Sequence, residues 1–249
     1  MMEWTAAELL ALWERGALEP WAARALTLLD AAHPELPSED MARLTIGERD
    51  VRLLEVREAL FGPRLDCLGE CGRCGEPVEA SLSTAELRTA ERGEPVEREA
   101  VQRLRIDEYD VAFRLPNSYD LLALEAAGSI GEAERRLLAC CVVAATSRDR
   151  AIGVDELPGA VVTVLGGWMA EADPHADVQV VLQCPRCANR WEAGFDIVTH
   201  LWAEIDAWAR RTLEEVHTLA SAYGWSEGDI LALSRARRQA YLDLLGSST

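Results

Sequence analysis

Apolar residues recur at the spacing of an amphipathic helix over most of this 249-residue chain. The clearest pattern covers residues 198–221, where one face is apolar over six turns. The chain is therefore expected to be mainly helical. The predicted helices cover residues 2–16, 20–33, 47–61, 119–127, 132–146, 156–173 and 198–221, and two shorter ones begin after Ser226 and Ser234.

Strands are predicted in fewer places, where β-branched and alternating residues lie between turn residues. Residues 85–103 are polar and rich in Glu and Arg, and they predict a helix or a loop. The predicted strands are residues 65–68, 78–82, 109–115 and 177–182, with one more that ends near Ile197.

Two CxxC motifs are the strongest chemical signal in the sequence. Cys71-Gly-Arg-Cys74 and Cys184-Pro-Arg-Cys187 are each followed, at the same offset, by a large apolar residue, Glu and Ala. Each CxxC turn directs two sulfurs toward one point, and two such knuckles supply the four thiolates of a tetrahedral structural zinc site. The repeated pattern predicts a zinc ribbon assembled from two distant halves, with Cys71, Cys74, Cys184 and Cys187 as ligands.

The elements together predict an α+β fold, mainly α, organised around a split four-cysteine zinc ribbon. A metal that joins Cys74 to Cys184 would close a loop of about 110 residues and stabilise the fold by about 4–5 kcal/mol. Loss of a ligand is then expected to unfold the ribbon. The predicted parts are an N-terminal helical segment (1–62), the ribbon (63–198, knuckles 71–74 and 184–187) with a mostly helical insertion (85–176), and a C-terminal helical segment (199–249).

The other cysteines leave alternatives open. Cys67 lies four residues before Cys71 and is a spare or alternative ligand. Cys140 and Cys141 lie in an apolar run, which is typical of small buried residues, with a redox role as the alternative. A four-thiolate site also suits rubredoxin-like iron, and an unmetallated or disulfide state is the third alternative to zinc.

The sequence carries none of the common catalytic patterns. His33, His175, His200 and His217 are not paired with one another at ligand spacing. There is no Gly-rich phosphate loop, nucleophile elbow or pair of catalytic carboxylates. A closed four-cysteine zinc site also leaves no position for water or substrate. We expect a protein that is not an enzyme and has no small-molecule substrate.

Charge argues against nucleic acid as the partner. The net charge is −18, and all 25 basic residues are Arg. Such a chain is repelled by phosphate backbones, and no basic patch with interleaved aromatic residues offsets this. There is no apolar run long enough to span a membrane and no secretory signal pattern, so a cytoplasmic protein without membrane insertion is expected.

Tryptophan is frequent, with eight residues in the chain. Ordinary core packing explains such residues, but Trp and Arg are also the preferred anchors of protein–protein interfaces. The candidate partner-binding residues concentrate near the C-terminus. They are Trp202, Trp208, Trp225, Arg235, Arg237 and Arg238.

Three segments resemble the T4-type bacteriophage baseplate protein family, as found in phage-tail-like contractile injection systems. The resemblance covers most of residues 44–245. The segments are Leu44–Asp50 with Glu58–Gly62 and the first CxxC, Phe113–Leu121, and Cys184–Cys187 continuing through Trp202–Ile205 to His217–Ser226.

The resemblance implies a non-enzymatic component or assembly factor of a baseplate, incorporated in the injection particle or acting transiently on it. Its partners would be other baseplate, hub or spike proteins. The family's metal pattern carries over to Cys71, Cys74, Cys184 and Cys187, with structural Zn²⁺ as the ion. Two other functions stay open: a zinc-ribbon module associated with nucleic acid or transcription, and a thiol or iron redox protein.

Overall fold

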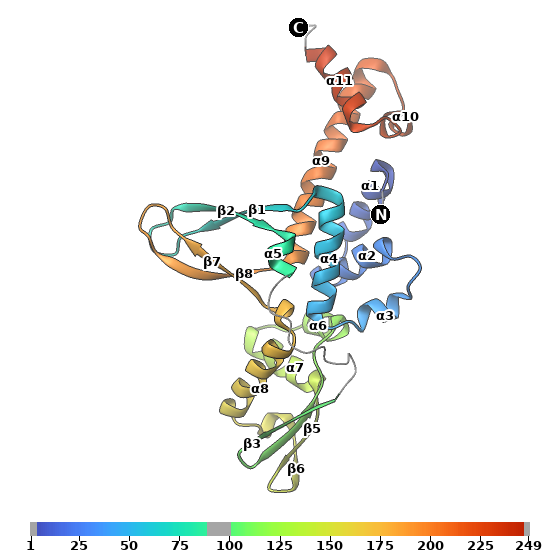
Figure 1. Cartoon of the computed structure of the whole chain (residues 1–249). Helices are drawn as coiled ribbons and strands as arrows, with labels where there is room; N and C mark the ends of the chain where they lie inside the picture. Colours follow the sequence, from blue (N-terminus) through green and yellow to red (C-terminus); the bar gives the residue numbers. More distant parts are fainter. Residues whose placement is uncertain (1–3, 89–100, 247–249) are drawn as a thin grey trace.

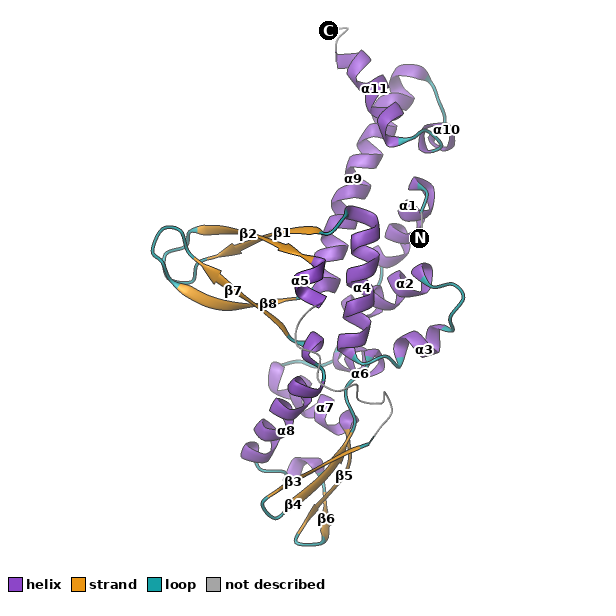
Figure 2. Ribbon diagram, viewed as in Figure 1, coloured by secondary structure: helices purple, strands orange, loops and turns teal. Residues whose placement is uncertain are grey.

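The computed structural model describes residues 4–88 and 101–246 and shows a helical body from which three parts project (Figures 1 and 2). It is 58% helical and 20% strand, which confirms an α+β fold that is mainly α. The helices are α1 Ala6–Ala17, α2 Trp21–Ala32, α3 Ser38–Ala42, α4 Ile46–Phe61, α5 Thr84–Arg88, α6 Ser118–Leu124, α7 Ile130–Cys141, α8 Gly159–Ala172, α9 Ile197–Tyr223, α10 Glu227–Leu231 and α11 Arg235–Gly246, with short 3-10 turns η1 Val154–Glu156 and η2 Pro174–Ala176. The strands are β1 Arg64–Glu70, β2 Pro77–Ser83, β3 Gln102–Ile106, β4 Tyr109–Phe113, β5 Val142–Ser147, β6 Arg150–Ile152, β7 Val178–Gln183 and β8 Arg190–Phe195.

The body consists of α1, α2, α4 and the first half of α9, packed around one apolar core. Capping boxes start two of these helices: Thr5 with Glu8 at α1, and Thr45 with Glu48 at α4. The apolar stripes that predicted these helices face inward, because burial of those stripes is the main source of helix stability in a small domain. The core centres on Leu28, Leu29, Leu53, Leu201 and Ile205, all fully buried.

An ion pair links α4 to α9 inside the body. The Arg57 guanidinium is 3% exposed and donates two hydrogen bonds to the Glu204 carboxylate, of 2.7 and 2.8 Å. A third bond runs from Arg57 to the carbonyl of Gly62, where α4 ends. The bidentate geometry fixes both the register of the two helices and the point where the chain leaves for β1.

Two antiparallel hairpins, β1–β2 and β7–β8, project from the body, and their tips lie together although they are far apart in sequence (Figure 1). These are the strands predicted on either side of each CxxC motif. Their bases pack against the body core, through Leu65 of β1, Leu82 of β2, and Val178, Val180 and Phe195 of the second hairpin. The body therefore holds both hairpins before any metal is considered.

The insertion contains more sheet than the sequence predicted. Four antiparallel strands form a sheet in the order β3-β4-β5-β6, and only β4 was foreseen. The predicted helix 132–146 is wrong at its C-terminal end, because α7 stops at Cys141 and the chain continues as β5. Val142 and Val143 suit either state, and pairing of β5 with β4 decides between them. The prediction for residues 85–103 falls mostly outside the described residues, with α5 before the gap and β3 after it.

The insertion attaches to the start of α4 at two places, one between β4 and α6 and one at the end of α8. On one side, Thr45 forms a β-bridge with Asn117, and the Ile46 N–H donates to the Pro116 carbonyl at 3.3 Å. On the other side, the Asp173 carboxylate accepts the Gly47 N–H at 2.9 Å and occupies the space where a Cβ on residue 47 would lie. The helix N-terminus thus supplies free N–H groups to a carboxylate from the end of α8.

The C-terminal half of α9 extends away from the body and carries α10 and α11 at its end (Figure 1). Gly224 ends the helix in a left-handed conformation, with φ of 67°. A separate small core forms there between Val216 and Leu219 of α9 and Ile230 of α10. The second half of α9 with α10 and α11 is therefore an arm with its own core, whereas the first half of α9 belongs to the body. The aromatic residues of the arm, Tyr223, Trp225 and Tyr241, contact one another.

The Arg57–Glu204 pair gives a testable pH dependence. Burial alone would raise the pKa of Glu204, but the hydrogen bonds and charge of Arg57, with His200 nearby, lower that pKa to about 2. A depressed carboxyl pKa stabilises the fold fully above its ordinary value near 4.5, and this stabilisation is lost as the pH falls from about 4.5 toward 2. Glu204→Gln should lower the free energy of unfolding by about 3 kcal/mol at pH 7, because it leaves a buried guanidinium unpaired.

Denaturant unfolding at several pH values tests this, with Glu39→Gln as the control. Glu39 forms an exposed pair with Arg43, so its loss should change stability by less than about 0.5 kcal/mol. An equal effect of the two substitutions would contradict a special role for the α4–α9 pair.

Candidate metal centre

The two CxxC motifs form the tips of the two hairpins and have matching backbone geometry. In the first, the Cys71 N–H donates to the Glu76 carbonyl at 2.9 Å, and in the second the Cys184 N–H donates to the Asn189 carbonyl at the same distance. The residue after each second cysteine is left-handed: Gly75 has φ of 69° and Ala188 has φ of 57°. The similarity of the two motifs in sequence is therefore a similarity of structure.

The four cysteine sulfurs lie together at the contact of the two tips. The Cys71 and Cys187 sulfurs are 3.7 Å apart, those of Cys74 and Cys184 are 3.6 Å apart, and all four lie within 4.8 Å of one another. A tetrahedron of sulfurs with Zn–S bonds of about 2.3 Å has edges of about 3.8 Å. A disulfide needs about 2.0 Å and is not formed. The arrangement fits a four-coordinate metal.

The electrostatics of the cluster also favour a cation. Burial alone would raise the pKa of Cys71, but the backbone N–H groups of Arg73 and Cys74 point at its sulfur and lower its pKa to about 6. The N–H of Glu76 acts in the same direction on Cys74, yet the neighbouring sulfurs raise its pKa to about 12. Ionisation of Cys71 is therefore favoured and that of Cys74 is opposed, and a bound cation would relieve the opposition.

The surroundings of the sulfurs are apolar and join the two tips. Val78 and Trp191, the large residues that follow the two motifs at equal offsets, pack against the cysteines. Arg186 of the second tip forms an exposed ion pair with Glu76 of the first, at 3.2 Å. The Asn189 side-chain amide approaches the Cys71 sulfur at 3.9 Å, and the sequence analysis did not predict this contact.

Comparison with known families assigns the chain. Residues 28–199 match the model of the T4 bacteriophage base plate protein family, and this range includes both hairpins, the insertion and α4 of the body. The chain belongs to this family. No curated protein and no solved structure matches it. The resemblance read from the sequence is confirmed, although the matched range ends before the C-terminal arm, which the resemblance had included.

The structure places the remaining cysteines of this baseplate-family protein away from the cluster. Cys67 lies in β1, paired with Ala80, and its sulfur is 4.0 Å from Nδ1 of His200 on α9. Burial raises the pKa of the Cys67 thiol. Cys141 is 1% exposed, and burial raises its pKa to about 12, which suits a small buried residue. Among the described residues, the sulfurs that come together are those of the two CxxC motifs.

The candidate partner-binding residues are in different situations. Trp202 packs in the body core under the guanidinium of Arg24, and Arg238 is 4% exposed and bound to Glu215 at 2.9 Å. Both are therefore removed from the predicted surface, because packing within the chain occupies their side chains. Trp208 and Trp225 are half-buried, and Arg235 and Arg237 are exposed on α11. For these four, partner binding stays a prediction.

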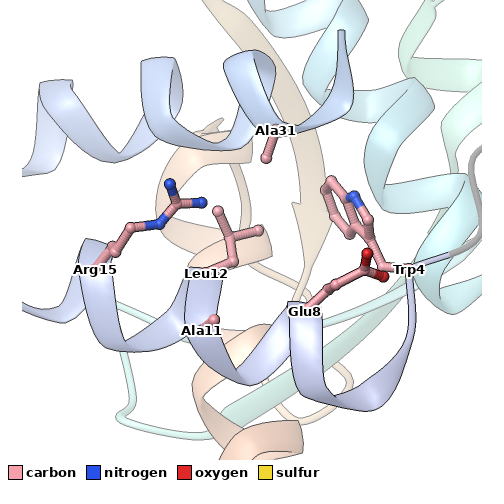
Figure 3. Close-up of a pocket in the computed structure, with 6 residues that line it drawn as sticks. All are labelled: Trp4, Glu8, Ala11, Leu12, Arg15 and Ala31. Atoms are coloured by element: carbon pink, nitrogen blue, oxygen red, sulfur yellow. The ribbon is translucent and has the colours of Figure 1, made fainter. Parts of the chain in front are cut away.

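A shallow pocket lies between α1 and α2, away from the cysteines (Figures 1 and 3). Its charged groups are Glu8 and Arg15, which lie on either side of Leu12 along α1, with Ala31 of α2 across from them. The Glu8 carboxylate already accepts bonds from the backbone and hydroxyl of Thr5, both at 2.8 Å. The pocket therefore brings together no set of reactive groups.

Each tip has one residue in the left-handed backbone conformation, and substitutions at these two residues should change the free energy of unfolding in opposite directions. Ala188→Gly should raise the free energy of unfolding by about 0.5–1 kcal/mol, because glycine adopts positive φ without the Cβ penalty. Gly75→Ala should lower it by a similar amount, and a Cβ there meets only the Glu70 carboxylate at 3.8 Å. Gly72→Ala is the control, since Gly72 lies in the same turn without positive φ and with open space around it. Thermal unfolding of the three variants checks the order.

Metal removal should affect the ribbon more than the body. The hairpin bases are already held in the body core, so the metal closes a loop of about 15 residues at the tips and stabilises the fold by about 3 kcal/mol. This is less than the 4–5 kcal/mol expected when only the sequence was considered. Cys187→Ser or a chelator should lower the melting temperature and deprotect β2 and β7 in hydrogen exchange.

Cys67→Ser is the matched control and should retain the metal, which elemental analysis can measure. A Cys187→Ser protein that loses its metal and keeps full stability would show that the metal has no structural role. Loss of metal from Cys67→Ser would instead make Cys67 a ligand.

Proposed function

We propose that this protein is a non-enzymatic structural component or assembly factor of the baseplate of a phage-tail-like contractile injection system, stabilised by one structural Zn²⁺ at Cys71, Cys74, Cys184 and Cys187. The single observation that carries the proposal is the family match over residues 28–199, which includes both halves of the cysteine cluster. A structural baseplate component binds other baseplate proteins. The family match supports a baseplate component, and the injection-system context and the zinc are what the proposal adds to it.

The shape of the molecule supports a role in assembly. The ribbon, the sheet of the insertion and the C-terminal arm project from the body in different directions (Figure 1). The sheet unit and the arm each have a small core of their own, so each presents a defined surface at a distance from the body. Such a shape suits contacts with several neighbours. Hub, spike and sheath-baseplate proteins are the partners we propose.

Charge supports protein partners over nucleic acid. The segment 67–183, which holds the first knuckle and the insertion, has 21 acidic residues and 11 Arg, for a net charge of −10. A segment with this net charge repels phosphate backbones. Among the described residues no helix is long and apolar enough to cross a membrane. We propose that the protein acts in the cytoplasm and enters, or acts on, the assembling particle.

The cluster itself supports zinc as the ion, with iron as the competing one. Four thiolates at tetrahedral spacing with no further ligand suit Zn²⁺ in a closed structural site, and the same set binds iron in redox proteins. Elemental analysis distinguishes the two ions. An iron–thiolate centre would also absorb visible light, which d¹⁰ zinc does not.

Co-purification tests the proposed function. The tagged chain is produced together with the whole neighbouring gene cluster and recovered at low salt. We expect spike, hub or sheath-baseplate proteins to co-purify, and we expect no retention on DNA or RNA. Recovery of none of these proteins would argue against the baseplate role. Presence in finished particles would indicate a permanent subunit, and presence only in incomplete ones an assembly factor.

A further inference from the structure

The outer face of α8 is apolar although it is exposed. One side of the helix buries Val161 and Leu165 against the sheet of the insertion. The other side carries no charged residue from its first position to residue 170, and its one hydroxyl, that of Thr163, bonds to the carbonyl of Gly159 in the same helix at 3.0 Å. We call this side the α8 face; it consists of Gly159, Ala160, Thr163, Val164, Gly166, Gly167 and Ala170, all exposed.

A helix of this composition is normally covered on all sides. Surface helices of globular proteins have a polar face toward water, and other helices of this chain, such as α1 and α9, follow that rule. Val164, midway along α8, is 49% exposed. The described part of the chain supplies nothing that covers it.

The glycines of the α8 face have no steric explanation within the part of the chain that the structure describes. A Cβ built at Gly166 or Gly167 meets no described atom within 4 Å. Glycine in a helix is less stable than alanine, so these positions weaken the isolated helix without relieving a steric conflict. Small residues at this spacing let a second helix backbone approach closely. The missing Cβ atoms therefore leave room on this side for a close approach by another backbone.

We propose that the α8 face binds an apolar helix of another baseplate protein that carries Arg or Lys near both of its ends. This inference rests on the proposed function and names the surface and the kind of partner. The charge of the helix ends decides the partner's chemistry. Asp155 lies exposed just before α8, and Glu171 lies exposed at its last turn, about 20 Å farther along the axis. Glu156, beside Asp155, is paired with Arg150 at 3.1 Å.

A second copy of this chain does not fit the α8 face. Each copy carries a net charge of −18. Two α8 helices packed together would place acidic ends against acidic ends in either orientation, since both ends carry a carboxylate. An interface that brings like charges together is destabilised by their repulsion. The partner is therefore a different chain, and its basic ends complement Asp155 and Glu171.

The first test compares Val164→Glu with Val181→Glu in the full-length chain, co-produced with the neighbouring gene cluster. Val181 is a matched control because it is 56% exposed on β7, away from α8. We expect wild type and Val181→Glu to recover baseplate proteins equally, and Val164→Glu to recover at least tenfold less of one of them. Unchanged recovery by Val164→Glu would overturn the proposal and leave the proposed function intact. If wild type recovers none, the proposed function fails and this inference fails with it.

A second variant separates loss of binding from misfolding, because it should stabilise the chain and weaken partner binding at the same time. Gly167→Ala should raise the melting temperature of the isolated chain by roughly 2–4 °C, since alanine favours helix and the space is open. It should also weaken partner recovery, since the new methyl group separates the backbones. Higher stability with unchanged recovery would overturn the proposal.

A photo-crosslinking amino acid at position 164 identifies the occupant. The proposal requires a crosslink to an apolar helix of a baseplate protein, with Arg or Lys near both ends. A crosslink to a second copy of this chain, or to no protein in the co-purified complex, would overturn it. Binding of the isolated chain to phosphatidylcholine vesicles, abolished by Val164→Glu, would assign the α8 face to a membrane surface and overturn it as well.

Discussion

The packing of α9 against α4 is the constraint on which the rest of the structure depends. Their apolar stripes form the centre of the body, and the Arg57–Glu204 pair fixes how the two helices are aligned. Each helix borders one hairpin: α4 leads directly into β1, and α9 follows β8. The body thereby brings the two halves of the cysteine cluster together, although they are far apart in the sequence. The insertion is fixed to the same body through the start of α4, where Asp173 accepts the N–H of Gly47.

Because the body already brings the two hairpins together, the role expected of a metal changes. A metal in an otherwise open loop would have to close the whole insertion, whereas here the core closes that loop and a metal would only join two tips that already face each other. The four sulfurs can fulfil this role only as thiolates, and their mutual repulsion favours a dication. Such a site would hold the two tips of the ribbon together locally, with Val78 and Trp191 packed against the cysteines.

The α8 face and the C-terminal arm are the surfaces that we propose for partners. The α8 face belongs to the insertion, inside the range that defines the family, whereas the C-terminal arm lies beyond it. An acidic chain that presents an uncharged helix face between two carboxylates is suited to a basic-ended helix and not to a copy of itself. The arm has its own core and exposed Arg235 and Arg237, so it offers a second surface of different charge.

The sequence by itself determined the helices of the body, the two hairpins and the cysteine cluster, because each depends on local signals: capping boxes, periodic apolar stripes and CxxC turns. It also determined the family. Only the tertiary structure decided that residues 142–147 are a strand, since Val142 and its neighbours suit helix or strand until β4 pairs with them. It also decided that Trp202 and Arg238 are internal and that one side of α8 is uncovered. Burial depends on which segments meet in space, and a local pattern does not contain that information.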